Sequence, residues 1–176
     1  RMKQKGISSF SKKRIWVIGA SSGIGEACAR ALIISGAKVA LSSRRVERLN
    51  QIAAAASANQ ALVLPLDVTN KGKLQETYQT ILDTWGDIDL LLYVSGVYTP
   101  QRADDFDIHV AEQTIDANLL GPMRAVALVL PEMLKAHAGH IAIVGSVAGY
   151  SGLPKALAYG PSKAAIINFC ENLYYD

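Results

Sequence analysis

Two residues of this 176-residue chain, Tyr159 and Lys163, are spaced for acid–base chemistry in the run Tyr-Gly-Pro-Ser-Lys. Residues four apart share one face of a helix, so the ammonium of Lys163 can lie close to the phenol of Tyr159. A neighbouring positive charge favours phenolate and lowers the pKa of a phenol from its free value of about 10. Tyr159 is therefore a candidate general acid or base. On spacing alone, an ordinary contact on a solvated helix is the commoner explanation.

A glycine-rich turn with the spacing Gly-x-x-x-Gly-x-Gly could bind a phosphate group. It follows the apolar, strand-like run 15–17 and precedes the helix-like run 26–32. In a strand–turn–helix unit, backbone N–H groups and the positive helix end can receive a diphosphate. No lysine follows the last glycine, which disfavours a P-loop, and a tight turn without any ligand is the alternative. The candidate cofactor-binding residues of the turn are Gly19, Ser21, Ser22, Gly23, Ile24 and Gly25.

Together these motifs resemble those of the short-chain dehydrogenase/reductase family, in its single-domain branch. The glycine spacing matches the family's cofactor motif, with Ile18 where the family usually has Thr. Asp67 and Val68, after the strand-like run 61–66, match the family's adenine-contacting Asp and its neighbour. The matches to the family's catalytic tetrad are Asn118, Ser146, Tyr159 and Lys163. The order and spacing of these motifs fit the family from residue 14 to the end of the chain.

One segment departs from the family pattern. The family's Asn-Asn-Ala-Gly after the fourth strand reads Tyr93-Val94-Ser95-Gly96 here, and only the glycine is retained. Gly96 therefore remains a predicted cofactor contact. We expect this departure to affect the local packing of the central strand and the adenine pocket more than the catalytic chemistry.

The resemblance implies reversible hydride transfer between a nicotinamide and a carbonyl or alcohol carbon. Ser146 would hold the substrate oxygen, and Tyr159 would give or take its proton. Lys163 would assist Tyr159 and contact the nicotinamide ribose, while Asn118 would keep a water in the proton relay. Taken singly, Ser146 could cap a strand end and Asn118 could be a polar residue that bends a helix. Their joint placement favours the catalytic roles.

The residues after the second predicted strand favour NADP(H) over NAD(H). An NAD-preferring enzyme usually has Asp or Glu there to accept from the ribose 2′-hydroxyl, and this chain has Ser43. Arg44 follows, and its planar, permanently charged guanidinium suits a 2′-phosphate. A solvated basic pair at the start of a helix is the alternative explanation.

The substrate class is only broadly defined by the sequence. The segments 97–107 and 149–157, with Tyr98, Leu153 and Leu157, should border the pocket. These apolar side chains favour a small-molecule carbonyl or alcohol on a hydrophobic body. A lipid-like ketone and an acyl-carrier-bound ketone are both open, and a sugar is disfavoured.

Alternating strand-like and helix-like segments predict an α/β fold, a Rossmann-like, doubly wound parallel sheet in three α/β/α layers. The predicted strand order is 3-2-1-4-5, with the cofactor at the switch point between strands 1 and 4. Residues 14–176 would form the NADP(H)-binding domain. The family's sixth and seventh strands have no counterpart here, so this domain is expected to be incomplete at its C-terminal end. The predicted strands are 14–19, 37–42, 60–66, 88–94 and 139–145, and the predicted helices are 23–35, 45–57, 70–85, 108–136 with interruptions at Pro122 and Pro131, and 158 to the end.

Composition supports one globular domain, because half of the residues are apolar and 19% are charged. The formal charge of +3 comes from residues 1–14, whose six basic residues leave the rest of the chain at −3. Residues 1–13 are therefore expected to form a basic, flexible tail, and nucleic-acid binding is disfavoured. No apolar run reaches the roughly 18 residues of a membrane span. Cys28 and Cys170 are expected as buried thiols in the cytoplasm.

Three functions compete on this pattern. The favoured one is an NADP(H)-dependent oxidoreductase, and the second is a catalytically silent NADP(H) sensor or scaffold on the same fold. The third is a nucleic-acid-binding module that would use the basic tail. No metal site is expected, because His109, His137 and His140 lack ligand spacing. Apolar runs such as 125–130 in the helices 108–136 and 158–176 resemble the family's interface helices, which predicts a homodimer or homotetramer.

Overall fold

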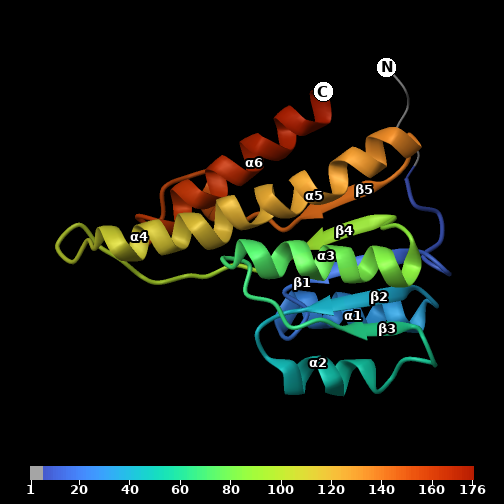
Figure 1. The fold of residues 1–176 in the computed structure, drawn as a ribbon. Helices are drawn as coiled ribbons and strands as arrows, with labels where there is room; N and C mark the ends of the chain where they lie inside the picture. The colour runs from blue at the N-terminus through green and yellow to red at the C-terminus, as the bar shows by residue number, and fades with distance from the viewer. Residues whose placement is uncertain (1–5) are drawn as a thin grey trace.

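The computed structural model describes residues 6–176 and contains one parallel sheet in the order β3-β2-β1-β4-β5 (Figure 1). This is the predicted order, and it is confirmed. The strands are β1 (Arg14–Ile18), β2 (Lys38–Ser42), β3 (Ala61–Val63), β4 (Leu90–Tyr93) and β5 (His140–Ile143). The crossover connections are helical, as parallel strands require.

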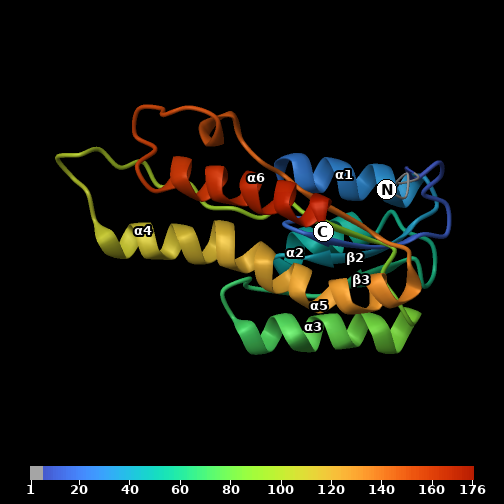
Figure 2. The same ribbon diagram turned by 90° about the horizontal axis from the view of Figure 1, so that it is seen from above.

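The helices lie close to their predicted positions. Figure 2 shows α1 and α3 on opposite sides of the sheet, which gives the three layers. The α-helices are α1 (Gly23–Ile34), α2 (Val46–Ala53), α3 (Lys71–Trp85), α4 (Ile108–Ile115), α5 (Gly121–Ala136) and α6 (Tyr159–Tyr175). Two short turns complete them, the π-helical η1 (Asp116–Leu120) and the 3₁₀-helical η2 (Val147–Gly149).

The alternation of side chains along β1 explains the two hydrophobic layers. Successive residues of a strand face opposite sides of the sheet. Trp16 and Ile18 therefore join one buried cluster, with side chains of α3 and α5, and Phe169 and Leu173 of α6 pack against it. Ile15 joins the other cluster, with side chains of α1 and α2. Burial on both faces holds β1 at the centre of the sheet.

The register brings the carboxyl ends of the strands to one edge. Ile18 at the end of β1 pairs with Ser42 of β2 and with Tyr93 of β4, and Tyr93 pairs with Ile143 of β5. β3 is shorter than predicted. The N–H of Leu66 nevertheless donates to the Ser43 carbonyl at 3.0 Å, so the extended chain continues along β2. The segments that follow the strands are thus gathered at this edge.

The long helix predicted over residues 108–136 changes geometry just before Pro122. In η1 the N–H of Gly121 donates to the carbonyl of Asp116, five residues back, where an α-helix uses the carbonyl four back. Pro122 has no N–H, so the carbonyl of Asn118 also loses its α-helical donor. Pro131 lies within α5 without ending it. The residue four positions before it, Ala127, is exposed, and its carbonyl loses the α-helical donor because Pro131 has no N–H.

The predicted basic tail falls partly outside the described residues, which begin at Gly6. Ile7 packs against the cluster formed with α1 and α2. The N–H of Lys12 donates to the carbonyl of Gly36 at 2.9 Å. Flexibility of residues 1–13 stays a prediction. Among residues 6–176 there is no helix long and apolar enough to cross a membrane.

Candidate active site

A cleft of about 1170 Å³ opens where the strands end, at the predicted switch point between β1 and β4. Its walls come from the segments that follow all five strands and from α4 and α6. Eleven predicted site residues line it: Gly19, Ser21, Ser22, Ile24, Ser43, Arg44, Asp67, Val68, Gly96, Tyr159 and Lys163. A cleft of this size accommodates a cofactor-sized ligand.

The turn between β1 and α1 contains two glycines at which a Cβ atom would clash with neighbouring backbone. Gly19 has φ +95, and a Cβ there would lie 2.5 Å from the backbone N of Ser95. A Cβ on Gly25 would collide with the carbonyl oxygen of Gly19. Gly23, with φ +52, begins α1, and the N-cap residue Ser22 makes no side-chain capping bond. The first N–H groups of α1 are therefore not capped by Ser22, and an anion such as a diphosphate fits there.

Two arginines stand beside this turn at the end of β2, and only Arg44 was predicted. Arg45 also lines the cleft. Its Nε donates to the Ser21 hydroxyl at 3.2 Å, and its Nη2 donates to the Ser21 carbonyl at 3.3 Å. Arg45 thus ties the end of β2 to the glycine-rich turn. The Arg-Arg pair in the sequence was the signal that could have identified it.

Asp67 and Val68 follow the extended segment beside Ser43. One carboxylate oxygen of Asp67 accepts from the Thr69 N–H at 3.0 Å and from the Thr69 hydroxyl at 2.7 Å. These hydrogen bonds from Thr69, with a smaller contribution from the charge of Arg44, hold the pKa of Asp67 below its ordinary value. Asp67 is therefore a charged, oriented acceptor in the cleft wall.

Tyr159 and Lys163 lie together in the first turns of α6. The Lys163 Nζ is 5.8 Å from the centre of the Tyr159 ring and donates to the carbonyl of Val144 at 3.1 Å. Lys163 is only 6% exposed, and burial lowers the pKa of its amine from the ordinary value. Gly96 faces both Asn118 and Lys163, because a Cβ there would lie 3.3 Å from Asn118 Oδ1 and 3.6 Å from Lys163 Nζ. A cation thus stands beside the phenol at the cleft.

Tyr98 packs against Tyr159. The two rings meet edge to face, with centroids 5.0 Å apart, and Tyr98 is 53% exposed. Val97, Tyr98 and Thr99 line the cleft, as expected for the segment 97–107. The segment 149–157 is not part of that wall, but it pairs with 97–107 through a bridge between Gln101 and Ala156.

Asn118 is placed behind the cleft wall rather than in it. It is 2% exposed, and its side chain is hydrogen-bonded at both ends. The amide oxygen accepts from the Val97 N–H at 2.8 Å, and Nδ2 donates to the Val97 carbonyl at 2.9 Å and to the Ser162 hydroxyl at 3.1 Å. Ser162 in turn donates to the carbonyl of Tyr159 at 2.7 Å. Asn118 therefore connects the segment after β4 to α6.

Ser146 caps η2. Its hydroxyl oxygen accepts from the Ala148 N–H at 3.2 Å, so the hydroxyl hydrogen stays available to donate. It follows the cleft-lining residues Val144 and Gly145 without itself lining the cleft. Ser146 therefore caps a 3₁₀ helix rather than a strand end. Asn118 lies in the π-helical turn η1, whose change of geometry we assign to Pro122.

Comparison with known proteins identifies related sequences. The sequence profile of the short chain dehydrogenase family matches residues 13–176. An uncharacterized oxidoreductase of Staphylococcus aureus is 33% identical over 157 residues, which are 89% of this chain and 68% of the relative. One of Staphylococcus epidermidis is 34% identical over 167 residues, which are 95% of this chain and 72% of the relative.

Among solved structures, a short-chain dehydrogenase from Streptomyces avermitilis matches with a TM-score of 0.87 at 28% sequence identity. The match covers 92% of this chain and 59% of that one, so this chain spans less than two thirds of the solved protein. Sequence profile, relatives and fold all indicate the same family. The chain belongs to the short-chain dehydrogenase/reductase family.

Proposed function

We propose that this protein is an NADP(H)-dependent oxidoreductase that interconverts a ketone or aldehyde and an alcohol. One observation carries the proposal: the uncapped start of α1 and the Tyr159–Lys163 pair open into the same cleft. The first can bind a diphosphate and the second can move a proton. A dinucleotide whose nicotinamide end reaches Tyr159 would use both.

Bound NADP(H) would supply the hydride to the carbonyl carbon, or accept it from the alcohol in reverse. Tyr159 gives its phenolic proton to the substrate oxygen during reduction and takes it back during oxidation. The Ser146 hydroxyl donates its hydrogen to the substrate oxygen. The Ser146 hydroxyl oxygen continues to accept from the Ala148 N–H. A donor aimed at developing oxyanion charge lowers the barrier.

Lys163 places its charge 5.8 Å from the centre of the Tyr159 ring, and its Nζ hydrogens would bind the ribose of the cofactor. Asn118 takes part in the proton relay through its main chain. Its side chain is fully engaged with Val97 and Ser162, whereas its carbonyl has no α-helical donor because residue 122 is proline. That carbonyl is the group with which Asn118 would hold a water.

The preference for NADP(H) rests on the arginines after β2. Ser43 stands where an acid would accept from the ribose 2′-hydroxyl, and Arg44 and Arg45 both line the cleft there. Arg45 is already held by Ser21, so Arg44 is the arginine more available for a 2′-phosphate. Charge-assisted, bidentate pairing with a phosphate is the contact for which a guanidinium is best suited.

The substrate we propose has an apolar body beside its carbonyl. Tyr98 lines the cleft and presents an exposed ring next to Tyr159. A ring or alkyl chain can bury surface against it, whereas a sugar would lose hydration there. Cys28 and Cys170 are free thiols and half-buried rather than buried as expected, and free thiols support a cytoplasmic location.

Turnover of a carbonyl panel by the full-length protein tests the function. NADPH oxidation is followed at the nicotinamide absorption band with aromatic, alicyclic and sugar carbonyls. Tyr159→Phe should lower kcat about 100- to 10,000-fold and leave NADPH affinity nearly unchanged, because the phenol acts on the substrate oxygen. Tyr174→Phe, an exposed tyrosine in the same helix, is the matched control. Normal turnover by Tyr159→Phe would refute the mechanism, and NADPH binding without any turnover would favour the sensor or scaffold.

A further inference from the structure

Tyr93 stands where the family has the first Asn of its Asn-Asn-Ala-Gly motif, and its hydroxyl reaches the π-helical turn η1. Tyr93 is 1% exposed, and its Oη–H donates to the carbonyl of Ala117 at 3.3 Å. Ala117 immediately precedes Asn118 in η1. Burial holds the pKa of the Tyr93 phenol far above its ordinary value, so the hydroxyl remains a hydrogen donor throughout the working pH range.

The Ala117 carbonyl needs this donor because of the local sequence. In an α-helix it would accept from the N–H of Gly121, but that N–H donates to Asp116 instead. The π-helical donor would be residue 122, which is a proline without an N–H. A buried carbonyl without a partner is costly, and the Tyr93 hydroxyl supplies the missing bond. The Ala117 carbonyl also belongs to the same planar peptide unit as the Asn118 N–H.

Gly121 makes the space for the Tyr93 hydroxyl. A Cβ on Gly121 would lie 2.5 Å from Tyr93 Oη, so no larger residue fits there without displacing the ring. The tyrosine on β4 and the glycine after η1 are thus a matched pair. Their contact fixes how η1 packs on the end of β4.

We infer that Tyr93 is a positioning residue, which fixes η1 from the central sheet and thereby sets the main chain of Asn118 for the proton relay. The inference rests on the proposed function for its catalytic consequence. Tyr93 does not line the cleft, so it acts on the site through its hydrogen bond to Ala117 and its contact with Gly121. The ion pair between Asp116 and Arg124 at 2.7 Å also spans the turn, so loss of the hydroxyl loosens η1 without unfolding it.

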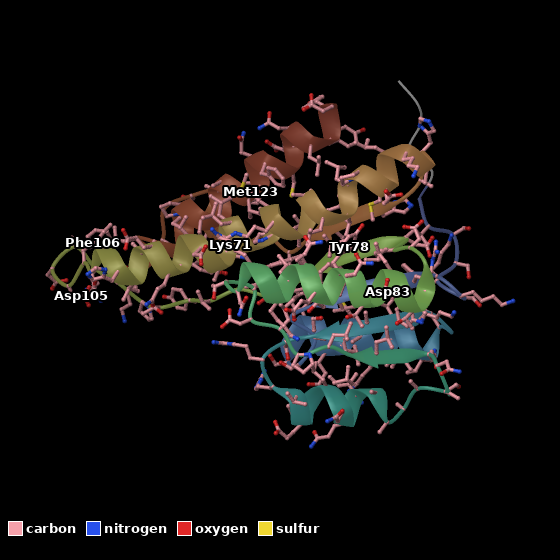
Figure 3. The ribbon with its side chains drawn as sticks, viewed as in Figure 1. Lys71, Tyr78, Asp83, Asp105, Phe106 and Met123 are labelled. Carbon is pink, nitrogen blue, oxygen red and sulfur yellow. The ribbon has the colours of Figure 1, made fainter. Side chains whose placement is uncertain are left out.

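Tyr93→Phe tests this by removing one oxygen atom. Because 3.3 Å is long for an O–H···O bond, we expect kcat to fall about threefold to tenfold. The KM of the carbonyl and the Kd of NADPH should change by less than about twofold. Tyr78→Phe is the matched control, since Tyr78 lies on α3 in the same hydrophobic cluster (Figure 3). A purely structural role would lower the melting temperature and leave kcat unchanged well below it, and that outcome would overturn the inference.

A second variant and a spectroscopic measurement guard against misfolding. Gly121→Ala should displace the Tyr93 hydroxyl and lower kcat as Tyr93→Phe does, while the double variant should lose less than the product of both single losses. Multiplicative losses would contradict the matched contact. The side-chain amide resonances of Asn118, identified from their absence in Asn118→Asp, should shift in Tyr93→Phe and not in Tyr78→Phe. Unshifted Asn118 resonances in Tyr93→Phe would overturn the inference. A parent protein that turned over no carbonyl would instead refute the proposed function, and the resonance shift would still test the role of Tyr93.

Discussion

Replacing Lys163 with Met should stabilise the cofactor-free protein while it removes activity. Lys163 is 6% exposed, and the hydrogen bond it makes is to the Val144 carbonyl at 3.1 Å. Among the described residues, no carboxylate forms an ion pair with its Nζ. The ammonium group therefore loses its hydration in the folded state. The hydrogen bond to Val144 offsets only part of that desolvation cost until a cofactor binds.

The magnitude follows from two opposing contributions. Loss of the charged hydrogen bond to Val144 costs about 1.5 to 3 kcal/mol. Removing the cation relieves a desolvation penalty of several kcal/mol, on the order of the values found for buried ions. Met has a similar length and helix propensity, so packing and helix stability change little. The net gain should be about 1 kcal/mol, which raises the melting temperature of a domain of this size by roughly 2 to 4 °C.

The gain should depend on pH in one direction. Burial lowers the pKa of Lys163 in the folded state below the unfolded value of about 10.4. The unfolded chain therefore binds more protons between the two values, and the parent protein gains stability as pH rises through that window. Below the folded pKa the desolvation penalty is fully present. The advantage of Lys163→Met should therefore be greatest at neutral pH and shrink as pH approaches about 10.

Urea unfolding of the cofactor-free proteins at several pH values measures this difference. Lys135→Met is the matched control, because Lys135 lies on α5 with its side chain 79% exposed and pairs with surface Glu132. It should change stability by less than about 0.5 kcal/mol. In the same preparations, Lys163→Met should lower kcat about 100-fold or more and weaken NADPH binding. A Lys163→Met protein that is less stable than the parent at neutral pH, or whose advantage grows with pH, would refute the argument.

Two further predictions concern the cofactor and the assembly. The parent protein should bind NADPH more tightly than NADH, and Arg44→Asp should narrow or invert that preference through loss of a contact worth about 1.5 to 3 kcal/mol; equal or better NADH binding by the parent in a titration would defeat this. The protein should be a dimer or tetramer in light scattering at micromolar concentration, because α5 leaves Leu134 exposed and Leu128 and Leu130 half-buried. A single monomeric species would contradict it.

Strand order and the glycine-rich turn could be predicted because they depend on local pattern. Short, continuous apolar runs and glycine turns are encoded in consecutive residues, and parallel strands with helical crossovers leave few topologies. The same holds for Tyr159 and Lys163, since four positions on one helix fix their proximity. The placement of Gly19 next to Ser95 already needed the packing of β1 against β4.

The tertiary structure alone decided which groups complete the site. Arg45 contacts Ser21 across 24 positions, Tyr93 contacts Ala117 across 24, and Asn118 contacts Ser162 across 44. No local pattern encodes such pairs, because they depend on how separate elements pack. The sequence pattern predicts Asn118 as a site residue, and Tyr93 departs from the family motif. Only the packing of η1 on β4 connects these two residues. Pro122 leaves the Ala117 carbonyl without a local donor, so its donor comes from a residue distant in the sequence, Tyr93.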